Sequence, residues 1–169
     1  TWNPLLSEIL TQPNSTKVFD SSKIPGEIMD LMVVNTATLK KNPALGKALV
    51  GAWYEIMGVM SASDKAAVAA KTAMATASGT DLAGFDSQLA STKMFYTPAS
   101  ALDLVNSDEL LKTMQKVAEF SFDHGLLGEG APDAKFIGVE GPKGVYGDKK
   151  NVKLRFDTTY MQLAADKKL

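Results

Sequence analysis

The chain has 169 residues and a formal net charge of -1, with 45% hydrophobic and 22% charged residues. This composition suits one globular domain, or one large piece of a domain pair, and excludes a disordered or fibrous chain. The near-neutral charge, without a dense Lys/Arg cluster, excludes a nucleic-acid-binding surface. The lack of cysteine excludes disulfides, thiol nucleophiles and thiolate metal sites, and no apolar run is long enough to predict a transmembrane helix.

The first 34 residues predict one short helix and two strands. Asn3 followed by Pro4 is typical of a helix start, so we expect a helix through residues 5–10. Two apolar runs with β-branched residues have the character of strands, namely residues 17–19 and residues 28–34. Between them lie an Asp-Ser-Ser sequence that predicts a turn or helix start, and a Pro-Gly turn.

From residue 36 to residue 125 the pattern predicts helices. Asn42-Pro43 opens a long amphipathic helix, in which three- and four-residue spacing places Leu45, Leu49 and Trp53 on a core-facing stripe. Four more helices are expected: from Ser63-Asp64 to Ser78-Gly79, over residues 81–90, from Thr97-Pro98 onward, and from a Ser107 cap to His124-Gly125.

The last part of the chain predicts a different organisation. Residues 125–147 are rich in Gly and Pro and indicate a loop-rich connection. Residues 151–156 alternate apolar with basic side chains, which is typical of a half-buried strand, and Asp157 then caps a final helix. The sequence as a whole therefore predicts a helix-rich α/β fold.

Residues that could perform catalysis are scarce. The one histidine, His124, lies at a predicted helix C-terminus beside Gly125, where capping explains it better than chemistry. The glycines of residues 125–130 follow no strand, so they do not indicate a dinucleotide loop. No nucleophile, metal or phosphate-binding motif is present, and we expect neither enzymatic activity nor a cofactor nor a metal.

Five residues near the start of the chain are candidates for ligand binding. Trp2 offers a flat apolar face and Asn3 both donates and accepts hydrogen bonds, although Trp2 could equally pack on a helix end. Ser21 and Ser22, at a helix start, could present hydroxyl and backbone N–H donors, with ordinary capping as the alternative. Glu27 could meet N–H donors or a cation, or lie solvated on the surface.

An ordered set of segments along nearly the whole chain carries a family resemblance. These segments are residues 1–4, 19–28, 30–34, 39–53, 120–127 and 152–157. Together they resemble the C-terminal half of the nitrate-, sulfonate- and taurine-type substrate-binding proteins of ABC importers, and most of all the subgroup linked to urea carboxylase. No single segment is diagnostic, so the resemblance depends on their order.

The resemblance implies the C-terminal portion of a two-lobed type II periplasmic-binding-protein fold. Residues 1–33 would then end the second lobe, supply one cleft wall and contain the crossover strand around residues 31–34. Residues 34–169 would form a helical return segment that packs on the first lobe, followed by a C-terminal tail. The other half of the protein, with the opposite cleft wall, is expected to lie outside this chain.

The resemblance also implies a function in transport. Trp2, Asn3, Ser21, Ser22 and Glu27 would line an interlobe cleft that captures urea or a guanidine-like compound and delivers it to membrane permease subunits outside the cytoplasm. Nitrate, taurine or another sulfonate is the alternative ligand. An enzyme of the thiamin-pyrimidine synthase type shares the fold, but those enzymes depend on cysteine and histidine residues, and this chain has no Cys and one His.

Overall fold

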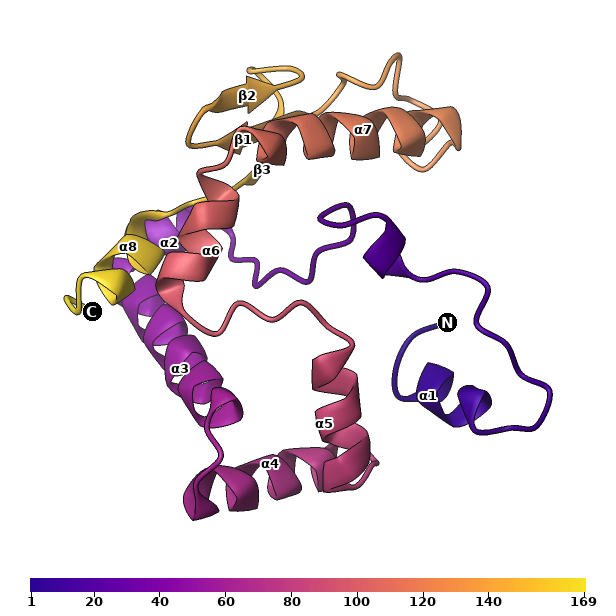
Figure 1. Ribbon diagram of the computed structural model, residues 1–169. Coiled ribbons are helices and arrows are strands. Elements are labelled where there is room, and N and C mark those ends of the chain that lie inside the picture. The colour runs from indigo at the N-terminus through magenta and orange to yellow at the C-terminus, as the bar shows by residue number, and fades with distance from the viewer.

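Eight α-helices, one 3-10 turn and one small sheet make up the chain, in a computed structural model that describes all 169 residues (Figure 1). The elements in chain order are α1 (Leu5–Leu10), η1 (Ser21–Lys23), α2 (Thr36–Lys41), α3 (Pro43–Ser61), α4 (Lys65–Ala77), α5 (Leu82–Ala90), α6 (Pro98–Val105), α7 (Glu109–Asp123), β1 (Gly138–Gly141), β2 (Gly144–Tyr146), β3 (Val152–Arg155) and α8 (Thr159–Ala165). The fold is mixed α/β and rich in helix, so the predicted fold class is confirmed at this level.

Short polar side chains start several helices where the sequence predicts them. The Asp64 carboxylate accepts the first N–H groups of α4 at 2.9 and 3.0 Å, and Asp81 accepts the Gly84 N–H of α5 at 2.7 Å. Thr97 caps α6 by accepting the Ser100 N–H at 3.2 Å. Each cap satisfies backbone donors that have no partner within the helix, which fixes where the helix begins.

Glycines end α4 and α7 at the predicted positions. Gly79 and Gly125 have φ angles of 76° and 70°, a left-handed conformation that costs glycine little. After α7 the Leu126 N–H donates to the Ser121 carbonyl at 2.7 Å, which closes the helix end. The predicted ends of these two helices are therefore confirmed.

A helical body forms where α8 lies against α3 and α6 (Figure 1). Met57 of α3 and Leu102 and Val105 of α6 are among its buried side chains. α3 and α8 approach each other closely, because a Cβ atom at Gly46 would overlap the Tyr160 ring. The missing side chain at Gly46 therefore allows Tyr160 to lie on the helix backbone.

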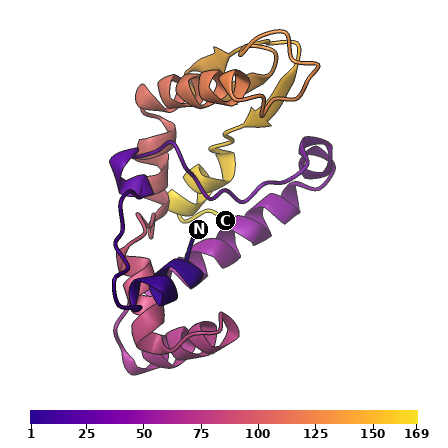
Figure 2. The same cartoon turned by 90° about the vertical axis from the view of Figure 1, so that its right-hand side faces the viewer.

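A separate sheet body consists of β1, β2 and β3 with α7 packed against them (Figure 2). β1 is central, antiparallel to β2 and parallel to β3, with Val139 opposite Tyr146 and Leu154. α7 buries Leu110, Met114 and Ala118, three positions spaced by four residues on one helix face. This amphipathic pattern explains why α7 and the sheet stay together.

The three strands correct several sequence predictions. Residues 17–19 and 28–34 form no strand and make no backbone hydrogen bonds. They have the side chains of strands but no partner strand within this chain, and a strand is stable only when its backbone groups are paired. Residues 125–147, predicted to be loop, contain β1 and β2, whereas the strand predicted over residues 151–156 is confirmed as β3.

Smaller corrections concern single side chains. Trp53 is 42% exposed and does not lie in the core. The buried face of α3 contains Gly46 and Met57, and the predicted core-facing residues Leu45, Leu49 and Trp53 lie beside this face and stay partly exposed. Asp108, not Ser107, occupies the cap position of α7, and the Ser107 hydroxyl has no hydrogen-bond partner. Asp157 does support α8, since its carboxylate accepts the Thr159 N–H at 2.9 Å.

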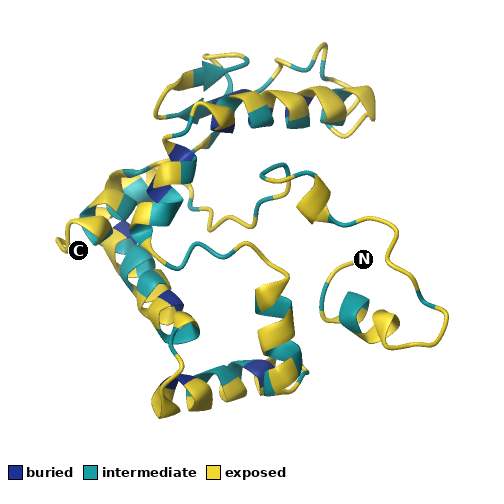
Figure 3. Ribbon diagram, viewed as in Figure 1, coloured by how far each residue is buried: buried dark blue, intermediate teal, exposed yellow.

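Little of the chain is buried. Only 11 of 169 residues are buried, and most of the ribbon is exposed or intermediate (Figure 3). The chain exposes 11476 Å², whereas a compact monomer of its mass exposes about 8,000 Å². Large apolar side chains account for part of this surface, including Val18, which is 94% exposed.

The contact between Gly46 and Tyr160 predicts a destabilised variant. We expect Gly46→Ala to lower the free energy of unfolding by about 1–3 kcal/mol, because the added methyl group overlaps the ring. Gly58→Ala on the same helix is the matched control: no atom lies within 4 Å, so alanine should stabilise the helix by about 0.5–1 kcal/mol. Thermal unfolding followed by circular dichroism measures both, and a Gly46→Ala variant as stable as the parent would contradict this packing.

Candidate functional site

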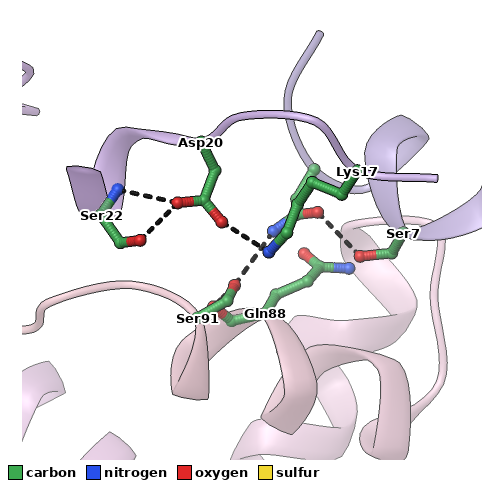
Figure 4. Close-up of polar contacts among 7 residues, drawn as sticks. Ser7, Lys17, Asp20, Ser22, Gln88 and Ser91 are labelled. Carbon is green, nitrogen blue, oxygen red and sulfur yellow. Dashed lines mark hydrogen bonds and ion pairs between the residues drawn. The ribbon is translucent and has the colours of Figure 1, made fainter. Parts of the chain in front are cut away.

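The N-terminal arm, defined as residues 1–34, meets the rest of the chain at the end of α5. The Asn3 Nδ2 donates to the Ser91 Oγ at 3.4 Å, and the Asn3 Oδ1 accepts the Ser7 hydroxyl at 2.7 Å (Figure 4). The bond to Ser91 is the one side-chain hydrogen bond between the arm and the remaining residues. Asn3 therefore anchors the arm with a single long hydrogen bond.

A carboxylate inside the arm receives three donors. The Lys17 Nζ lies 2.5 Å from one Asp20 oxygen, and the other oxygen accepts the Ser22 N–H at 3.0 Å together with the Ser22 hydroxyl. The Lys17 hydrogen bond, followed by those of Ser22, lowers the pKa of Asp20 from 3.8 to about 2. Asp20 is the residue that caps η1, and both Ser22 donors are used in this cap.

Two hydrogen-bond networks lie near the end of α5, one of Asn3, Ser7 and Ser91 and one of Lys17, Asp20 and Ser22, and we call them together the polar cluster (Figure 4). Its members come from the arm and from the last turn of α5: Asn3, Ser7, Lys17, Asp20, Ser22, Gln88 and Ser91. The Gln88 side chain extends from α5 toward Lys17 and Ser7, while its carbonyl accepts the Ser91 hydroxyl at 2.8 Å (Figure 4). The cluster thus presents amide, hydroxyl, ammonium and carboxylate groups together.

The five predicted site residues are only partly brought together. Asn3 and Ser22 belong to the polar cluster, whereas Trp2, Ser21 and Glu27 make no side-chain hydrogen bond or ion pair. Trp2 is 82% exposed and Glu27 is half-buried in the turn after η1. A binding role for these five residues stays a prediction, although the Ser22 donors expected to face a ligand are already bound by Asp20.

Sequence reasoning missed most of the polar cluster. The Lys17–Asp20 contact could have been predicted, since opposite charges three residues apart can pair and an aspartate before Ser-Ser can cap a turn. The sequence near Gln88 and Ser91 does not indicate a contact with the arm, because that contact depends on the tertiary path of the chain.

A shallow apolar hollow of about 500 Å³ lies beside Lys17. It is lined by α1 and residues 15–19, with Leu6, Ile9 and Phe19 among the apolar side chains. None of the five predicted site residues lines it.

The chemistry available at these sites is binding by hydrogen bonds and charge. His124 lies at the end of α7, where its ring stacks on Phe120 at 4.0 Å and its Nδ1 is 2.8 Å from the Phe120 carbonyl, so the predicted C-terminal position is confirmed. No three His, Cys, Asp or Glu side chains are grouped so that they could hold a metal ion. None of the helices combines the length and the apolar character needed to cross a membrane.

Comparison of the chain with protein-family models, with curated proteins and with solved structures found no match.

The hydrogen bond from Lys17 predicts the titration of Asp20. Because the folded pKa is depressed, the pair favours the native arm above the ordinary pKa of 3.8, and this contribution is lost as pH falls toward 2. We expect Lys17→Met to raise the Asp20 pKa toward 3.8, measured by carbon NMR of the side-chain carboxyl groups. Lys143→Met should raise the pKa of its own partner Asp108 and leave Asp20 unchanged; an Asp20 pKa insensitive to Lys17 would refute the assignment.

Proposed function

We propose that this chain is the C-terminal half of the solute-binding component of an ABC importer, folded as part of a two-lobed type II periplasmic-binding protein. The segments that resemble this family support the proposal, as does the helix-rich α/β class of the fold. In this proposal residues 1–33 form one cleft wall, and residues 34–169 pack on the other lobe.

The observation that carries the proposal is the excess of exposed surface. The chain exposes about 3,400 Å² more than a compact monomer of its mass. Covering this excess with a partner would bury about twice that area in total, which is the scale of large obligate interfaces, at about 2,000–5,000 Å² and above. An excess of this size therefore supports a permanent cover, such as another lobe, over a transient partner.

The unpaired segment over residues 28–34 fits the same proposal. Ile28 and Val33 are exposed, and no backbone group of the segment is hydrogen-bonded within the chain. A crossover strand between lobes obtains its partner strands from the lobe it enters. Residues 28–34 have strand-like side chains but no partner strand. A crossover strand would be left in this condition if the lobe that it enters were absent.

The proposed mechanism follows from the weak anchoring of the arm. The arm is joined to α5 by one 3.4 Å side-chain hydrogen bond, so it can move relative to the helical body. Ligand enters the open cleft, polar groups from both lobes replace its water, and closure stabilises the bound state. The closed form then docks on the permease subunits at the outer face of the membrane.

The ligand class proposed is a small nitrogen compound, urea or a guanidine-like molecule. The polar cluster offers several acceptors for N–H donors, among them the Asp20 carboxylate and the Ser91 hydroxyl. Nitrate, taurine or another sulfonate is the alternative. Catalysis of the thiamin-pyrimidine synthase type is disfavoured because the one histidine, His124, contacts Phe120 at the end of α7 and makes no contact with the cluster residues.

Calorimetric titration tests the ligand class. We expect the full two-lobed protein to release or absorb heat with urea or guanidine, because its cleft groups replace the hydration shell of N–H donors. Nitrate and taurine serve as comparison ligands. Heat with nitrate or taurine alone would select the alternative class, and heat with none of the four would reject the transport proposal.

Tryptophan fluorescence tests the position of the cleft. Trp2 is exposed beside Asn3, so ligand binding and closure should change its emission. We expect Trp2→Phe to remove the fluorescence response to the ligand while Trp53→Phe, on α3, retains it. The opposite pattern would place the ligand away from the N-terminal arm.

A further inference from the structure

A second hollow, of about 450 Å³, lies in the helical part of the chain. It is bounded by the last turn of α3, by α4 and α5, and by the segment of residues 92–96 that follows α5 (Figure 1). None of the five residues predicted to bind ligand lines it. Its volume is within the range of small-molecule sites, which is about 300–1,000 Å³.

Two opposite charges meet in the wall of this hollow. The Lys71 Nζ of α4 lies 3.2 Å from an Asp86 oxygen of α5, and the protein covers most of the Lys71 side chain, which is only 13% exposed. An ammonium has three N–H donors and a carboxylate about four acceptor positions. Each of the two side chains has only the other as a hydrogen-bond partner. Both groups therefore retain hydrogen-bonding capacity for a ligand in the hollow that they line.

Apolar side chains supply much of the remaining wall. Met60 lies at the end of α3, Leu89 lies three residues after Asp86 on the same face of α5, and Met94 and Tyr96 follow in the connecting segment. All four are half-buried. Methionine side chains are flexible and polarizable, so they adapt to the shape of an apolar group. The hollow thus combines one ion pair with an adaptable apolar surface.

An ion pair of this kind complements a ligand that carries both charges. A lone cation is attracted by Asp86 and repelled by Lys71, and a lone anion meets the reverse, since the two groups are in contact. A zwitterion that lies across the pair brings its carboxylate to Lys71 and its ammonium to Asp86, so each charge has an opposite charge as its nearest neighbour. An α-amino acid carries both charges on one carbon atom, and its side chain is free to contact the apolar wall.

We propose that this hollow binds an α-amino acid with an apolar side chain of the size of leucine. Lys71 holds the carboxylate, Asp86 holds the ammonium group, and Met60, Leu89 and Met94 contact the side chain. All of these residues lie between residues 60 and 96, outside the N-terminal arm. The inference therefore goes beyond the proposed transport function and does not depend on it.

Methyl NMR of the whole chain, with carbon-labelled methionine, tests the site directly. Leucine should shift the methyl signals of Met60 and Met94, which line the hollow, and leave that of Met161 on α8 unchanged. Leucinamide lacks the carboxylate and isocaproate lacks the amino group, so each should bind about tenfold more weakly than leucine, the effect of one lost charge-assisted hydrogen bond. Glycine, which lacks the apolar side chain, should also bind more weakly than leucine.

Variants of the pair give a second measurement. Lys71→Met and Asp86→Asn should each weaken leucine binding by about tenfold. Lys112→Met is the matched control, because Lys112 pairs with Glu109 on α7 and lines no part of the hollow, so leucine affinity should not change. If a variant of the pair does not fold, the ligand series on the parent chain still tests both charges.

The inference is wrong if leucine shifts neither Met60 nor Met94, or if leucine, leucinamide and isocaproate bind equally well. Either result leaves the proposed transport function standing, because that function depends on the titrations with urea, guanidine, nitrate and taurine. Conversely, a chain that binds leucine in this hollow would keep this site even if those four titrations gave no heat.

Discussion

Apolar side chains that find no partner within the chain are the constraint on which this structure depends. α1, residues 17–19 and residues 28–34 carry the composition of buried elements, yet they lie on the surface. Two small bodies do acquire cores: α3, α6 and α8 pack together, and α7 covers the sheet. The arm packs on neither and is held at α5 through Asn3. Burial of these side chains against further protein would supply the stability that the arm lacks.

The same constraint connects the fold with the proposed function. The N-terminal arm does not form an enclosed site by itself. This property suits one side of a cleft between two lobes, because the ligand contacts are then divided between two surfaces that can move apart. The polar cluster lies where the arm meets α5, so a displacement of the arm would rearrange its hydrogen bonds.

The sequence predicted elements whose signals are local and failed where the partner is distant. Helix starts depend on local caps: Asp64, Asp81 and Thr97 each accept a hydrogen bond from an N–H group within three residues. Helix ends at Gly79 and Gly125 depend on the conformation of the glycine itself. These boundaries could therefore be predicted from the sequence. Residues 28–34 read correctly as strand-like, but no strand forms because pairing is a long-range property. β1 and β2 were missed because their glycines, at positions 138, 141 and 144, resemble those of a loop. Among the site residues, Asn3 and Ser22 lie in the polar cluster, while Gln88 and Ser91 join it only through the tertiary path of the chain.

Amide hydrogen exchange over residues 28–34 tests the central claim most directly, because these backbone groups have no partner within the chain. The measurement compares this chain alone with the longer two-lobed protein that we propose, using the capped helix α4 as an internal reference. Our account predicts rapid exchange of residues 28–34 in the isolated chain and strong protection in the full protein, where the segment pairs with strands of the other lobe. Equal, rapid exchange in both would contradict the account, since the segment would then be a surface loop with no strand to complete.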